Sequence, residues 1–175
     1  MHFLSFKVTG RRIIFLGYGM IRIELTWLEL FSACMVGVVR RISSLRNPDI
    51  VNRRFSDKGD WQIDIEGAIG EACFAKYQNL YWSMGVNTFK DPDVGTWQVR
   101  GTSYHKGHLI VRERDGHDAI ALVATSGMGG TLIGWIKIED AKKPEFWNED
   151  SWWVPQKILI PFADDTVEQT ATEPA

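Results

Sequence analysis

Residues 93–100, with the sequence DVGTWQVR, bring an acid, an amide and a cation together in one short segment. Asp93 follows the turn signal Asp91-Pro92, and the alternating pattern after it predicts a short strand. Because side chains alternate along a strand, Gln98 and Arg100 are expected on one face and their apolar neighbours on the other. A site for a divalent metal and a phosphate needs a carboxylate, a neutral oxygen donor and a cation.

A second acid, Glu71, precedes this segment in a stretch with helical periodicity. Asp93 is the best metal ligand of the set, Gln98 offers an amide oxygen, and Glu71 could complete the metal shell or hold a metal-bound water. Arg100 can neutralise phosphate charge through two N–H groups, but it cannot act as a general base because its pKa stays above ~12. We therefore predict a site of Glu71, Asp93, Gln98 and Arg100 for Mg²⁺ or Mn²⁺.

Each of these residues also has an ordinary structural use. Asp93 could simply cap its turn, which is a common role of aspartate. Glu71 could be a solvated helix residue, and Gln98 and Arg100 could form the wet face of an edge strand. The joint order and spacing of the four residues favour the site.

A helix with Glu71, then Asp93 at a turn, then a strand with Gln98-x-Arg100 is the order found in the core of the PD-(D/E)XK nucleases, which the chain resembles. It carries Gln-x-Arg where that motif has Asp/Glu-x-Lys. From about residue 24 to residue 161 it is also similar to a set of uncharacterised bacteriophage proteins. The shared segments include Gly70-Glu71-Ala72, Asp93-Val94-Gly95, Gln98-Val99-Arg100, Leu109-Ile110-Val111-Arg112 and Gly134-Trp135-Ile136. The resemblance implies a restriction-endonuclease-like fold and a phage or prophage origin.

Two helices are expected ahead of the strands. Thr26 and Glu29 form a capping-box signature, and the apolar spacing after them predicts a helix that ends near residues 43–44. A second helix is expected from an N-cap at Asp64 to about Tyr77, with glycines that permit close approach to a neighbouring element. The segment between the helices, residues 46–60, is polar and predicts a loop.

From residue 80 the periodicity changes to that of strands, with one short helix expected at 140–147. The strands are expected at 81–82, 86–89, 96–102, 108–112, 119–125, 131–138, 153–154 and 158–160. This order predicts an α+β domain in which N-terminal helices pack on a mixed, largely antiparallel sheet. We expect residues 1–19 to be an extension, from a start codon set too early, that forms a strand or hairpin if ordered. Residues 20–161 are then the nuclease-like domain, and 162–175 a disordered acidic tail.

The charge of the chain is unevenly distributed. The net charge is −2, but the tail after residue 162 holds four acids and no base, which leaves a slightly basic body that suits a polyanion. Several cations could contact a DNA backbone. They are Arg40, Arg41, Arg46, Arg53, Arg54 and Lys106.

These patterns favour a cytoplasmic protein of an infected or lysogenic bacterial host that acts as a metal-dependent nuclease on DNA, with no membrane association. The alternative is a catalytically inactive nuclease fold that binds DNA or inhibits a host defence or DNA-processing protein. The degenerate Gln-x-Arg favours the alternative, and the intact acids favour the enzyme. Cys34 and Cys73 lack CxxC spacing and predict free, buried thiols.

Overall fold

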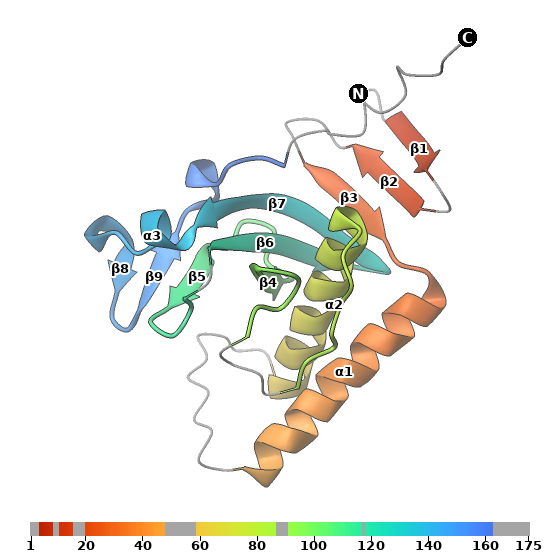
Figure 1. The fold of residues 1–175 in the computed structure, drawn as a ribbon, viewed down its shortest axis with the longest axis horizontal. Helices are drawn as coiled ribbons and strands as arrows, with labels where there is room; N and C mark the ends of the chain where they lie inside the picture. Colours follow the sequence, from red (N-terminus) through yellow and green to blue (C-terminus); the bar gives the residue numbers. More distant parts are fainter. Residues whose placement is uncertain are drawn as a thin grey trace.

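A six-stranded sheet forms the centre of the protein in the computed structural model, which describes residues 4–8, 11–15, 20–47, 59–86, 91–116 and 118–162 (Figure 1). The strand order is β1-β2-β3-β7-β6-β4, with β4 at one edge. β4 and β6 run parallel, and the other neighbours in this sheet are antiparallel. Its strands are β1 (Leu4–Val8), β2 (Arg11–Phe15), β3 (Ile21–Glu24), β4 (Trp97–Thr102), β6 (Ala119–Ser126) and β7 (Gly129–Lys137).

A second, three-stranded antiparallel sheet has the order β5-β9-β8, from β5 (Leu109–Arg112), β8 (Trp147–Asn148) and β9 (Ser151–Val154). Short helical turns surround it: α3 (Ile138–Ala141), η1 (Pro144–Phe146) and η2 (Gln156–Ile158). The predicted α+β class with a mixed sheet is confirmed, and so are the strands near 96–102, 108–112, 119–125 and 131–138. The pair 81–82 contributes only an isolated bridge between Trp82 and Val94.

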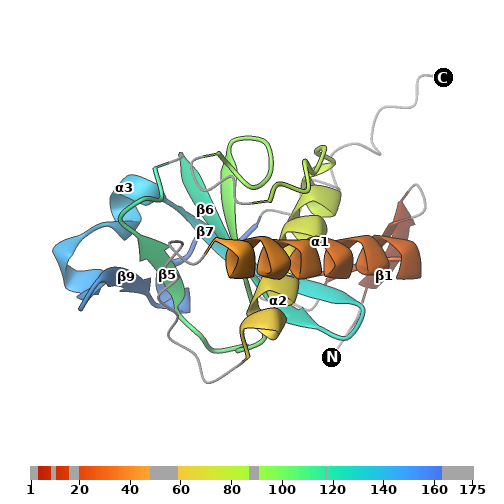
Figure 2. The same ribbon diagram turned by 90° about the horizontal axis from the view of Figure 1, so that it is seen from below.

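Helix α2 (Asp60–Gln78) packs against the sheet, and α1 (Trp27–Arg46) packs against α2 on the outside (Figures 1 and 2). One apolar core lies between α2 and the sheet, and its largest fully buried side chain is Phe74. A second core lies between β6, β7 and the small sheet, around Leu109 and Leu122. The predicted buried thiol is confirmed at Cys73, where burial raises the pKa to about 12, whereas Cys34 is only half-buried.

The predicted capping box begins α1: the Glu29 N–H donates to Thr26 Oγ1 at 3.2 Å, and the Thr26 N–H donates to Glu29 Oε2 at 2.6 Å. The helix ends at Arg46, later than expected. The predicted start of α2 at Asp64 is wrong, because the helix begins at Asp60 and Asp64 instead pairs with Arg41 on α1.

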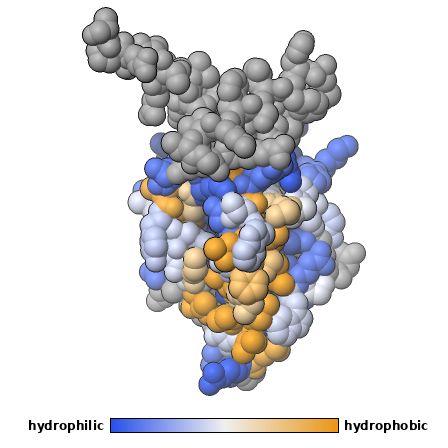
Figure 3. Space-filling model, turned by 90° about the vertical axis from the view of Figure 1, so that its right-hand side faces the viewer, coloured by the Kyte–Doolittle hydropathy of each residue, from blue (hydrophilic) through white to orange (hydrophobic). Residues whose placement is uncertain are grey.

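The apolar residues that predicted α1 face away from the body of the protein. The inner face carries small or medium side chains instead, and a Cβ at Gly37 would come within 2.5 Å of the Ile65 Cα, so the two helices are in close contact there. On the outer face, Trp27, Phe31 and Leu45 are more than half exposed. Figure 3 shows apolar residues gathered in a band down this side of the molecule.

Some expectations fall on residues outside the described ranges. They are Arg53 and Arg54 in the interhelical loop, most of the expected strand 86–89, and the acidic tail from residue 163. The backbones of β1 and β2 form an antiparallel hairpin that continues the large sheet through β3.

Candidate functional site

Strand β4 places Gln98 and Arg100 as the alternation predicts. Val99 belongs to the core against α2, and the Trp97 ring lies 5.3 Å from the Phe74 ring of α2. Gln98 and Arg100 therefore point to the opposite face of the edge strand. Gln98 is nevertheless buried, with 5% of its surface exposed, so this face is not the wet face of the alternative interpretation.

Asp93 lies at the free edge of β4, where it supports the strand backbone. Its N–H donates to the Trp97 carbonyl at 2.9 Å, and its Oδ2 accepts the Val99 N–H at 2.8 Å. The turn contains Gly95 at φ 59°, a conformation that glycine adopts at no steric cost. Asp93 thus satisfies an N–H that an edge strand would otherwise leave unpaired.

Glu71 is not solvated: it projects from α2 and is 4% exposed. Both carboxylate oxygens are bound by Arg40 of α1, with Nη1 to Oε1 at 2.6 Å and Nη2 to Oε2 at 2.8 Å. The Trp82 indole N–H adds a third hydrogen bond to Oε2 at 3.0 Å. Arg40 is itself fixed, because its Nε donates to the Gly85 carbonyl at 2.8 Å.

Arg100 has a partner that the sequence analysis did not identify. Its Nη2 lies 2.5 Å from Asp115 Oδ2, while its Nη1 lies 3.8 Å from Asp93 Oδ2. Asp115 is 5% exposed, and its Oδ2 also accepts the Arg112 N–H at 2.9 Å. The only signal was the Asp115-Gly116 pair, which predicts a turn and says nothing of a buried ion pair.

The structure therefore joins the predicted acids and cations, together with Asp115, into one largely buried array of opposite charges. It consists of Arg40, Glu71, Asp93, Arg100 and Asp115. Burial raises the pKa of Asp93 to about 6, and the negative charge of Glu71 adds to this, while Arg100 opposes it. Burial acts to raise the pKa of Asp115, but the charge of Arg100 and the hydrogen bonds from the Arg112 N–H and from Arg100 together hold that pKa below its ordinary value.

The groups proposed for a metal do not fit a divalent cation as they are arranged. Both oxygens of Glu71 bind Arg40, and one oxygen of Asp93 binds backbone. The Gln98 amide donates to the Asp91 carbonyl at 3.1 Å, and its oxygen lies 3.5 Å from Arg100 Nη1. Within the described ranges, no group of three or more His, Cys, Asp or Glu side chains is placed to hold a metal ion. Guanidinium groups neutralise these carboxylates, where a nuclease site would need a hard cation.

Two of the predicted DNA-contacting arginines are used inside the protein. Arg40 binds Glu71, and Arg41 pairs with Asp60 at 2.8 Å and with Asp64 at 2.7 Å. The Arg41 side chain is only 7% exposed, so in this conformation it offers little surface to a DNA backbone. Arg46 and Lys106 are exposed and remain available to a polyanion.

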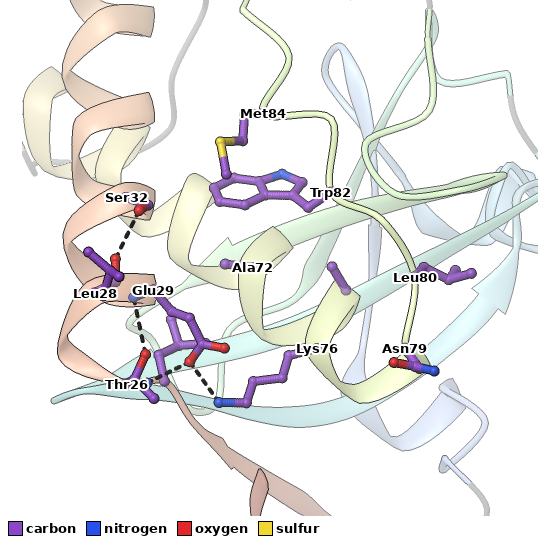
Figure 4. A pocket seen from close by; sticks show the side chains of 12 residues that line it. Thr26, Leu28, Glu29, Ser32, Ala72, Lys76, Asn79, Leu80, Trp82 and Met84 are labelled. Carbon is purple, nitrogen blue, oxygen red and sulfur yellow. Dashed lines mark hydrogen bonds and ion pairs between the residues drawn. The ribbon is translucent and has the colours of Figure 1, made fainter. Parts of the chain in front are cut away.

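A hollow of about 560 Å³ lies between α1, α2 and residues 80–84 (Figure 4). The indole of Trp82 forms part of its wall. Glu29 and Lys76 interact at its lower end in this view, at 2.7 Å. This hollow is lined by few titratable groups and is distinct from the predicted site.

Comparisons with family models, curated proteins and solved structures find no match to this chain. None of the helices in the described part of the chain is long and apolar enough to cross a membrane.

Proposed function

We propose that this chain is a catalytically inactive, nuclease-like domain that binds DNA and does not cleave it. The observation that carries the proposal is the bidentate salt bridge between Arg40 and Glu71. It occupies both carboxylate oxygens of an acid that a metal site would need. The second acid, Asp93, is engaged by the backbone of β4 and lies near Arg100. An array in which each buried acid has a guanidinium neighbour stabilises a conformation and leaves little negative charge to attract a metal.

The restriction-endonuclease-like core and the phage origin belong to the same proposal. Supporting it are the proximity of Glu71 to Asp93 near one edge strand and the α+β arrangement of helices on a mixed sheet. The remaining exposed cations, such as Arg46 and Lys106, would contact the phosphate backbone without reading sequence.

An active, Mg²⁺- or Mn²⁺-dependent nuclease is the second candidate. The observation that favours it is the raised pKa of Asp93, because strongly perturbed carboxylates gather at catalytic sites. In this case Arg40 would have to release Glu71 when metal and DNA bind.

Incubation of the protein with single- and double-stranded DNA and Mg²⁺ or Mn²⁺ separates the two candidates. We expect retention of DNA in a gel-shift assay with no cleavage, and no heat of metal binding by calorimetry. Gln98→Glu provides the acid that the motif lacks and reports whether one added charge is enough to create a metal site. Cleavage by the wild-type protein that disappears in Asp93→Ala would overturn the proposal in favour of the enzyme.

A further inference from the structure

The outer face of α1 carries a regular apolar repeat. Large side chains occur at alternating spacings of three and four residues, which is the a/d pattern of a coiled coil. The positions are Leu28, Phe31, Met35, Val38, Ile42 and Leu45. The opposite face, with Ala33, Val36 and Gly37, is the one that packs on α2. The repeat therefore has no partner among the described residues.

The exposed apolar area matches what a stable dimer needs. Seven large apolar side chains of α1 are between 44% and 71% exposed. A fully open aromatic side chain presents about 150–250 Å² and an aliphatic one less, so with these exposures the face offers on the order of 700 Å². The largest apolar patch of a monomeric protein is about 300–600 Å², and a standard interface buries about 800 Å² per partner.

We propose that α1 pairs with α1 of a second copy of this chain in an antiparallel, two-fold symmetric dimer. The repeat is symmetric about its midpoint, between Val36 and Gly37. Around that midpoint, an antiparallel copy places Leu28 opposite Leu45, Phe31 opposite Ile42, and Met35 opposite Val38. Each layer then combines an a residue with a d residue of the second helix.

The charges at the ends of α1 select the antiparallel orientation. Glu29 lies in the first turn and Arg46 in the last. A parallel pair would place the two Arg46 side chains at the same level, where like charges repel. An antiparallel pair places the two Arg46 side chains at opposite ends of the interface, and the two helix dipoles then run in opposite directions.

Two hollows flank the repeat and provide room for the side chains of a second copy. One is the hollow of about 560 Å³ that Leu28 and Met84 line (Figure 4). The other, of about 340 Å³, lies near the opposite end of α1 and is lined by Val39, Ile42 and Val86. In the two-fold dimer, the hollow near the start of α1 faces the end of the second copy's α1, and the hollow near the end faces its start.

Light scattering coupled to size-exclusion chromatography tests the dimer with the full chain. At ~100 μM, far above a micromolar Kd, we expect twice the 20.0 kDa mass of one chain. Met35→Glu, next to the two-fold axis, should give a monomer with an unchanged circular dichroism spectrum. Met128→Glu places the same charge on a residue that is also about half exposed but lies in the β6–β7 turn, and it should remain a dimer.

Disulfide trapping tests the orientation and does not depend on a destabilising variant. In a Cys34→Ser background, an equimolar mixture of Met35→Cys and Val38→Cys chains should cross-link to each other under mild oxidation, because those positions face one another in the antiparallel layer. Preferential cross-linking of Met35→Cys chains among themselves indicates a parallel pair and overturns the proposal. A wild-type protein that is monomeric at ~100 μM also overturns the proposal. The apolar face of α1 would then have to bind a partner other than a second copy.

Discussion

Asp93 lies between a carboxylate of like charge and a guanidinium of opposite charge, in a partly buried site. Its pKa of about 6 exceeds the ordinary value of 3.8, so the folded state holds a proton that the unfolded state releases between about pH 4 and pH 6. The contribution of Asp93 to the stability therefore falls as the pH rises through this window, and above it the ionised Asp93 destabilises the fold.

Asp93→Asn removes this titration and keeps an oxygen for the Val99 N–H. We expect the variant and the wild type to differ little near pH 4, and the variant to gain up to about 3 kcal/mol over the wild type by pH 7. Urea unfolding at a series of pH values measures the difference. Asp91→Asn, on an exposed residue of the same turn, should show no such trend. If the difference in the free energy of unfolding between Asp93→Asn and the wild type stays constant with pH, the assigned pKa is contradicted.

The Arg40–Glu71 pair permits a second test. Arg40→Met leaves a buried carboxylate with only the Trp82 indole as a side-chain partner, and we expect a loss of about 3–5 kcal/mol in the free energy of unfolding. Adding Glu71→Gln removes the unpaired charge and keeps an acceptor for the indole, so the double variant should recover much of the loss. Costs that simply add, measured by a double-mutant cycle in urea, would show that the two residues are not coupled.

The sequence analysis identified Glu71 and Asp93 as members of one site, but it did not identify the side chains that bind them. Asp93, Gln98 and Arg100 could be placed because a turn signal and a strand alternation are local. Arg40 meets Glu71 only because α1 and α2 pack in one register, and the sequence has no local signal for that register. The same holds for Asp115, which reaches Arg100 from the loop after β5.

At the scale of elements, the close packing of α2 on β4 depends on glycines. A Cβ at Gly101 would collide with the Glu66 carbonyl and lie 3.0 Å from the Gly67 Cα, and one at Gly70 would lie 2.8 Å from the Gly101 Cα. The prediction that glycines in the second helix permit close approach is correct at Gly70. Capping and turn signals likewise located most helix and strand segments. The face of α1 that packs inward was not predictable, because small residues rather than the large apolar ones meet α2.

A matched pair of alanine variants tests the contact. Gly101→Ala forces α2 away from the edge strand, and we expect a loss of at least about 2 kcal/mol in the free energy of unfolding. Gly67→Ala is in the same contact region, but a Cβ there has no atom within 4 Å. It should stabilise α2 by about 0.5–1 kcal/mol, since alanine favours a helix more than glycine does. Thermal melts of both variants measure the effect, and equal losses would show that the packing at Gly101 is not the cause.

At the scale of the whole molecule, the charge available to a partner differs from the charge in the sequence. The chain has 20 basic and 22 acidic residues, yet Arg40, Arg41 and Arg100 are neutralised by buried or half-buried acids. Among the residues that the structure describes, the cations left at the surface are therefore fewer than a count of arginines indicates. Any DNA binding by the described part of the chain is therefore expected to be weak and dependent on salt.

The salt dependence of DNA affinity tests this distribution. Arg46→Ala and Lys106→Ala each remove one exposed cation, and each should reduce the slope of log affinity against log salt by about one unit, equally for unrelated DNA sequences. The control is Lys137→Ala, which removes a cation that is 60% exposed. Lys137 ends β7 beside α3, far from α1 in Figure 1. The variant should leave the slope unchanged. Fluorescence anisotropy from about 50 to 200 mM salt gives the slopes. If neither Arg46 nor Lys106 affects the slope, these residues do not contact the phosphate backbone, and the binding function would then have to involve another surface or a protein partner.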